Sequence, residues 1–139
     1  MSRCSITILL LRQPSPDPLP VPTQLAGHAV HCQDCATLPA LLHCLQQARQ
    51  TAPAWVLIET ASADPAQWAA HGRELCAALD ALPAPYIEMA ANDDDSLDAH
   101  LHPLHAPAAQ VVCSSGRADA CRLSLAIAAR RLQTTVGSA

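Results

Sequence analysis

Short apolar runs alternate with longer stretches of helical periodicity along most of the chain. The apolar runs predict five strands, at residues 4–11, 28–32, 54–59, 86–89 and 110–113. The stretches between them predict three helices, at residues 37–49, 64–82 and 119–132. Every residue from Ile8 to Leu11 is apolar, which is typical of a central parallel strand with both faces covered.

Strands and helices alternate strictly after residue 27, which indicates the α/β class. We expect a flavodoxin-like, doubly wound, five-stranded parallel sheet with strand order 2-1-3-4-5, in a single domain that covers residues 1–139. Residues 133–139 are expected to fray. Ligands of such sheets bind beyond the carboxyl ends of the strands, so candidate chemistry is sought there.

A proline-rich segment, residues 14–26, interrupts this alternation. Proline stands at every second position from Pro14 to Pro22, and each one removes an amide donor and restrains the preceding residue. No helix can pass through such a segment, so we expect a stiff extended loop in place of the first crossover helix. A proline-rich ligand for a partner domain is the alternative interpretation.

The composition excludes several classes of function. The 139 residues contain no Lys, which excludes a Schiff-base or P-loop lysine, and no Phe. A net charge of −4 and the scarcity of aromatic residues argue against nucleic-acid binding. The apolar run of residues 6–11 is too short for a secretory signal or a membrane span. We therefore expect a cytoplasmic protein, without membrane contact, whose seven cysteines are reduced.

Histidine and cysteine gather at residues 28–44, and a second group of three histidines lies at residues 100–105 beside the carboxylates of residues 93–95. The first group has the ligand types for zinc, but a strand would place His28 and Cys32 on one face and His31 on the other. We therefore predict no metal and no cofactor. A metal- or redox-responsive α/β module that uses Cys32 and Cys35 remains an alternative.

The carboxyl-terminal half contains motifs that suggest a family. Residues 85–89, Pro-Tyr-Ile-Glu-Met, resemble the P-x-I/V-E-V strand of type II 3-dehydroquinate dehydratases. Residues 106–109 resemble their S-P-x-A motif, and residues 112–116 with 123–126 resemble their I-x-G-x-G and L-A-L motifs. Upstream, residues 8–14 are similar to their first strand and G-P-N loop. The resemblance implies a flavodoxin-like fold and a trimer-based homo-oligomer, up to a dodecamer.

The family that the chain resembles catalyses an anti elimination of water from 3-dehydroquinate. Departures from the family's motifs imply that this reaction is lost here. The family has N-P-x-A-Y-x-H after its third strand, where this chain has residues 59–65, Glu-Thr-Ala-Ser-Ala-Asp-Pro. Ala90 replaces the histidine that follows the fourth strand, and the lid with its tyrosine and arginine has no counterpart. We expect a degenerate, non-catalytic paralogue that keeps the fold either for assembly or for binding a small carboxylate.

The residues at the predicted carboxyl edge form the candidate site. Glu59 and Asp93 are the candidate bases if an altered, lyase-like enzyme acts on a related cyclic carboxylic acid, which is the alternative function. Side chains and amides that would hold the ligand are those of Arg12, Ser62, Ala91, Asn92, Ser114 and Ser115. An equally simple interpretation is that these residues belong to ordinary solvated loops.

Overall fold

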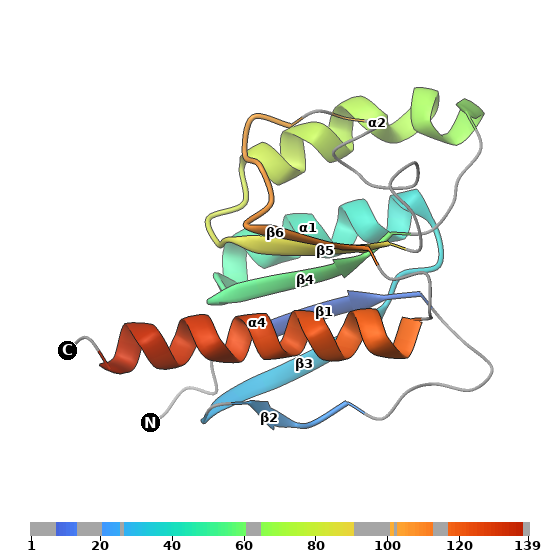
Figure 1. Ribbon diagram of the computed structural model, residues 1–139. Coiled ribbons are helices and arrows are strands. Elements are labelled where there is room, and N and C mark those ends of the chain that lie inside the picture. Colours follow the sequence, from blue (N-terminus) through green and yellow to red (C-terminus); the bar gives the residue numbers. More distant parts are fainter. Residues whose placement is uncertain are drawn as a thin grey trace.

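Strands and helices alternate through most of the chain, as Figure 1 shows. The computed structural model describes residues 8–13, 21–25, 27–60, 65–90, 101, 103–112 and 117–137. In chain order the elements are β1 (Ile8–Arg12), β2 (Gln24–Leu25), β3 (His28–Asp34), α1 (Leu38–Thr51), β4 (Trp55–Glu59), α2 (Pro65–Asp80), β5 (Tyr86–Ala90), β6 (Ala109–Val112) and α4 (Arg117–Gly137). The α/β class predicted from the sequence is confirmed.

One mixed sheet holds all the strands, in the order β2-β3-β1-β4-β5-β6. The pairs β3–β1, β1–β4, β4–β5 and β5–β6 are parallel, whereas β2 pairs with β3 in the antiparallel direction. The prediction of five strands, all parallel and in the order 2-1-3-4-5, was therefore wrong in count and in order. The difference arises from β2, which lies at one edge of the sheet.

Strand β2 exists because the chain reverses direction just after it. Gly27 has a φ of +82°, a backbone conformation that glycine adopts without steric cost. The reversal pairs Gln24 with Ala29 and Leu25 with His28, and the Val30 amide donates to the Thr23 carbonyl at 2.9 Å. The described residues between β1 and β3 contain this strand and no helix; residues 14–20 lie outside them.

The two faces of the sheet carry separate apolar cores, because side chains alternate along each strand. Leu9 and Leu11 of β1 pack with α1 and α2, and Ile8 and Leu10 pack with α4 on the other face. Figure 1 shows α4 alone across the front of the sheet, with α1 behind the strands and α2 above them in this view. Val21 and Leu25 pack against the edge of the α4-side core, so the end of the proline-rich segment covers part of that face.

Local signals in the sequence set both ends of α1. The Thr37 side chain accepts a hydrogen bond from the Ala40 amide at 3.2 Å and so caps the amino-terminal end of the helix. Ala52 takes the left-handed conformation at the carboxyl end, and its amide donates to the Ala48 carbonyl. Helix α4 continues to Gly137, beyond the predicted end at residue 132.

No helix in the part of the chain that the structure describes is both long and apolar enough to cross a membrane.

Truncating the central strand tests this arrangement. Leu57 is fully buried in β4, so Leu57→Ala is expected to lower the free energy of unfolding by about 2–5 kcal/mol. Leu104, which is 93% exposed, is the matched control, and Leu104→Ala is expected to change it by less than about 0.5 kcal/mol. Urea unfolding followed by circular dichroism measures both; equal effects would contradict the placement of β4.

Candidate functional site

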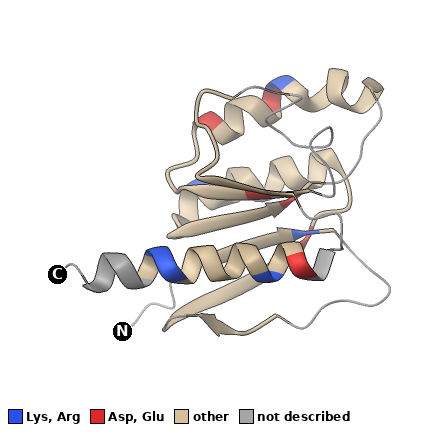
Figure 2. Cartoon of the chain, in the orientation of Figure 1, with Lys and Arg blue, Asp and Glu red and all other residues tan. Residues whose placement is uncertain are grey.

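The carboxyl ends of β1, β3 and β4 lie next to one another, because these strands are parallel neighbours. Arg12 and Asp34 are register partners at the ends of β1 and β3, and Glu59 ends β4. Figure 2 shows blue and red segments close together at this edge, whereas most of the sheet is uncharged. Two of the predicted site residues, Arg12 and Glu59, are thus brought to one edge.

Glu59 is held by the residue that follows β1. The Gln13 amide donates a hydrogen bond to Oε1 of Glu59 at 2.7 Å, a short distance typical of a charge-assisted bond. The Gln13 side chain donates through Nε2 to the Cys35 carbonyl at 2.8 Å and to the Glu59 carbonyl at 3.4 Å. Gln13 therefore links the ends of three strands, a role that its sequence position did not reveal.

Arg12 is held by Asp34. Its Nε lies 3.3 Å from Oδ1 of Asp34, and the two side chains are 21% and 55% exposed. The Cys35 amide donates to the Arg12 carbonyl at 2.8 Å, which fixes the backbone beneath the ion pair. The pair is partly accessible to solvent, so a solute that reaches this edge meets a positive and a negative side chain together.

Thr60 adds a buried hydroxyl to the same edge. It follows Glu59, and its amide donates to the Met89 carbonyl at 3.2 Å, which extends the β4–β5 ladder by one bond. Its Oγ1 is buried and finds no hydrogen-bond partner among the residues that the structure describes. A buried hydroxyl without a partner costs free energy, so a ligand oxygen or a water at this position would be stabilised.

The other predicted site residues lie outside the described residues. These are the candidate base Asp93 and the candidate ligand-binding residues Ser62, Ala91, Asn92, Ser114 and Ser115. The site therefore consists, in the described part of the chain, of the side chains of Arg12, Gln13, Asp34 and Glu59 with the hydroxyl of Thr60.

The cysteines of the first Cys/His group are divided between the two faces of the sheet. Cys32 packs against the α4-side core, and Cys35 is buried in the core of the α1 and α2 side. Cys35 instead contacts Cys44 of α1, to which its thiol donates a hydrogen bond with an Sγ–Sγ distance of 3.3 Å. No group of three or more metal-ligating side chains occurs within the described ranges.

His105 and Tyr86 lie at the other end of the strands. The Tyr86 hydroxyl donates to the His105 carbonyl at 2.7 Å, and their rings meet edge to face at 5.1 Å. The imidazole Nδ1 lies 2.9 Å from the Leu79 carbonyl, to which it donates, and the His105 amide donates to Asp80 at 3.0 Å. Tyr86 begins β5, so these groups belong to the amino edge of the sheet.

A groove of about 510 Å³ runs along α2. It is lined by Trp68, Gly72, Arg73, Cys76, Ala77, Asp80 and Leu101. None of the residues predicted from the sequence to form the site lines it.

Comparison with known proteins does not assign the chain to a family. No protein-family model matches the chain, and no curated protein matches it.

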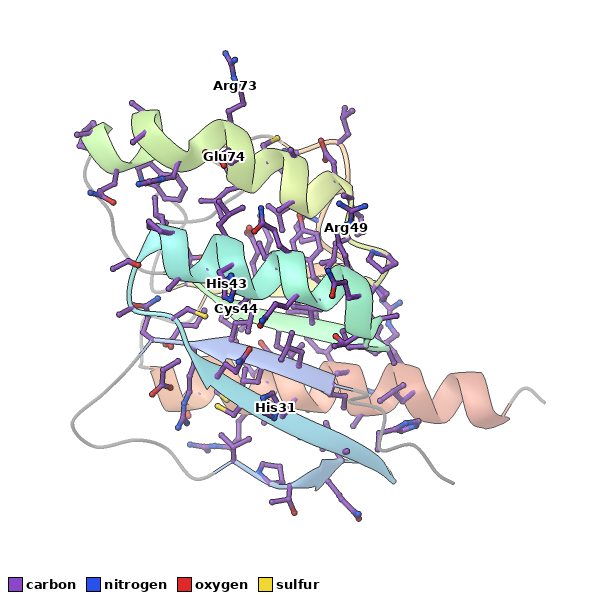
Figure 3. All side chains as sticks on the ribbon, turned by 180° about the vertical axis from the view of Figure 1, so that it is seen from behind. His31, His43, Cys44, Arg49, Arg73 and Glu74 are labelled. Carbon is purple, nitrogen blue, oxygen red and sulfur yellow. The ribbon has the colours of Figure 1, made fainter. Side chains whose placement is uncertain are left out.

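Removing the Glu59 carboxylate tests its bond to Gln13. Glu59→Ala leaves the Gln13 amide without this acceptor and is expected to lower the free energy of unfolding by about 1–3 kcal/mol. Glu59→Gln keeps an oxygen that accepts the bond and is expected to cost less than about 1 kcal/mol. Glu74, an exposed residue of α2 labelled in Figure 3, is the control. Equal unfolding free energies for Glu59→Ala and Glu74→Ala would contradict the bond.

The Cys35 thiol makes the free energy of unfolding depend on pH in the alkaline range. Burial, followed by the hydrogen bond to Cys44, raises the pKa of Cys35 from 9.0 to about 12. The unfolded chain therefore loses this proton at lower pH than the folded chain, so stability is full below pH 9 and falls as pH rises toward 12. Between pH 8 and pH 10, the unfolding free energy of the wild-type protein is expected to fall by about 1 kcal/mol more than that of Cys35→Ala. Chemical unfolding of both proteins at the two pH values measures this difference. The same change in unfolding free energy with pH in both proteins would contradict the raised pKa of Cys35.

Proposed function

We propose that this protein binds a small hydroxylated carboxylic acid at the carboxyl edge of its sheet. We further propose that it is a diverged relative of type II 3-dehydroquinate dehydratases that no longer dehydrates 3-dehydroquinate. The proposal depends above all on one observation, the placement of the Arg12–Asp34 ion pair beside the Glu59–Gln13 hydrogen bond.

The mixed charge of the edge selects the class of ligand. The Arg12 guanidinium suits a carboxylate, with which it forms charge-assisted hydrogen bonds. Asp34 and Glu59 would repel a simple anion but accept hydrogen bonds from hydroxyl groups. A compound with one carboxylate and several hydroxyls, such as a cyclic hydroxy acid, meets both requirements. The buried hydroxyl of Thr60 offers a further polar contact at this edge.

The topology supports the proposed flavodoxin-like fold. Its parallel strands lie side by side in the order β3-β1-β4-β5-β6, and helices cover both faces. In sheets of this kind ligands bind beyond the carboxyl ends of the strands, where the direction of winding changes. Strand β1 is the first of the described strands and lies between β3 and β4, so its carboxyl end is such a point. On this proposal β2 is an addition at one edge.

The contacts of Glu59 favour binding over catalysis. A general base needs its carboxylate beside the proton that it removes, but Oε1 of Glu59 already accepts the Gln13 amide at 2.7 Å. Tyr86 and His105, which have the side chains that the family uses, are bonded to each other at the amino edge. The altered lyase that would use Glu59 as its base is therefore the weaker proposal.

The family resemblance also leads us to propose a trimer-based homo-oligomer in the cytoplasm. Cys32, Cys35, Cys44 and Cys76 form no disulfide within the described part of the chain, which supports a reducing compartment. Light scattering measures the oligomeric state; a monomer at micromolar concentration would contradict the inherited assembly without bearing on the ligand.

Binding of 3-dehydroquinate tests the function. Titration calorimetry is expected to detect binding to the wild-type protein, weakened about tenfold or more by Arg12→Ala. The ion pair is partly exposed and contributes about 1 kcal/mol or less to stability, so this variant is expected to fold. Arg49, at the carboxyl-terminal end of α1 in Figure 3, is the matched control, and Arg49→Ala is expected to leave the affinity unchanged.

The same mixtures test the loss of dehydration. No enone absorbance of dehydroshikimate is expected to develop, and clear turnover would overturn the assignment as a binding protein. Equal affinities of Arg12→Ala and Arg49→Ala, or no binding to the wild-type protein, would overturn the proposed site.

A further inference from the structure

Cys35 and Cys44 form a buried pair of thiols in the described part of the chain. Cys35 lies between the end of β3 and the N-cap Thr37, and Cys44 lies within α1 (Figure 3). Their sulfur atoms are 3.3 Å apart, and the residues are 1% and 8% exposed. A disulfide needs an S–S distance of about 2.05 Å, so the two sulfurs would have to approach by about 1.3 Å.

We propose that Cys35 and Cys44 form a reversible disulfide by exchange with a small-molecule disulfide. The Cys44 thiolate attacks one sulfur of the small disulfide, forms a mixed disulfide and releases one thiolate. The Cys35 thiolate then attacks the Cys44 sulfur, closes the protein disulfide and releases the second thiolate. The two protons of the protein thiols go to the two departing thiolates, so the pair loses two electrons and the small disulfide gains them.

Burial determines the order and the rate of these steps. Cys44 is the more exposed thiol of the pair and therefore meets the small disulfide first. Burial raises the pKa of Cys35, so its thiolate is scarce at neutral pH and closure accelerates as pH rises. The protonated thiol also gives the reduced state no ionic stabilisation, in contrast to strongly oxidising pairs whose thiolate is stabilised. The disulfide is therefore expected to persist once it has formed.

The two competing interpretations of these cysteines fit the geometry less well. Cys32 packs in the opposite core, so pairing with Cys35 would require one of them to pass through the sheet. A closed zinc site needs four ligands, and the described residues offer no cluster of three or more suitable side chains.

The pair lies next to the carboxyl edge of the sheet. The Cys35 amide donates to the Arg12 carbonyl at 2.8 Å, and the Cys35 carbonyl accepts from Nε2 of Gln13, also at 2.8 Å. A disulfide would tie this backbone to α1 through a loop from residue 35 to residue 44. It would thereby restrain the backbone of residue 35, which is hydrogen-bonded to Arg12 and Gln13.

Incubating the full-length protein with oxidised glutathione at pH 8.5, under native conditions, tests the proposal. After alkylation of the remaining thiols, peptide mass spectrometry is expected to find Cys35 linked to Cys44, with the loss of two hydrogen atoms. The oxidised protein is expected to melt roughly 5–10 °C higher than the reduced protein. Dithiothreitol is expected to reverse both changes.

Variants separate this pair from the other thiols. Cys44→Ala is expected to abolish the link, whereas Cys76→Ala, which removes a half-buried thiol of α2, is expected to leave it intact. The wild-type peptide map decides the matter even if Cys44→Ala does not fold. Recovery of Cys35 and Cys44 as alkylated thiols, a link from Cys35 to Cys32, or a mixed disulfide that never closes would overturn the proposal.

Discussion

Strand β1 needs apolar cover on both faces, and the rest of the structure depends on this need. Every side chain from Ile8 to Leu11 is apolar and buried, so the strand cannot lie at an edge or face water. It is accommodated between β3 and β4, with α1 and α2 packed on one face and α4 on the other. The parallel pairing that follows directs the ends of β1, β3 and β4 to one edge of the sheet.

Polar chemistry begins where the apolar part of β1 ends. Arg12 pairs with Asp34, and the next amide, that of Gln13, donates to Glu59. These contacts connect three strand ends into one polar unit of mixed charge, which suits a ligand with both a carboxylate and hydroxyl groups. They also engage Oε1 of Glu59 in the link between β1 and β4. The backbone of Cys35 is hydrogen-bonded to Arg12 and Gln13, which connects the thiol pair to this polar unit.

The sequence predicted those features that depend on local pattern. Continuous apolar runs indicated the parallel strands, and the strand ends indicated Arg12 and Glu59. Strand β2 was missed because its two residues carry no hydrophobic pattern and its pairing depends on the turn at Gly27. The Cys35–Cys44 contact was missed because spacing along the chain suggested Cys32 as the partner. Cys44 shares a helix face with Leu41 and Leu45, a periodicity that indicates burial but not the partner.

Amide hydrogen exchange at Gln13 tests most directly whether the strand ends form one connected unit. If Glu59 holds this amide, NMR is expected to show exchange about tenfold or more slower in the wild-type protein than in Glu59→Ala. Glu59→Gln, which keeps an acceptor oxygen, is expected to retain most of the protection. Exchange of the Gln13 amide at the same rate in the wild-type protein and Glu59→Ala would contradict the connection between β1 and β4 on which the proposed site rests.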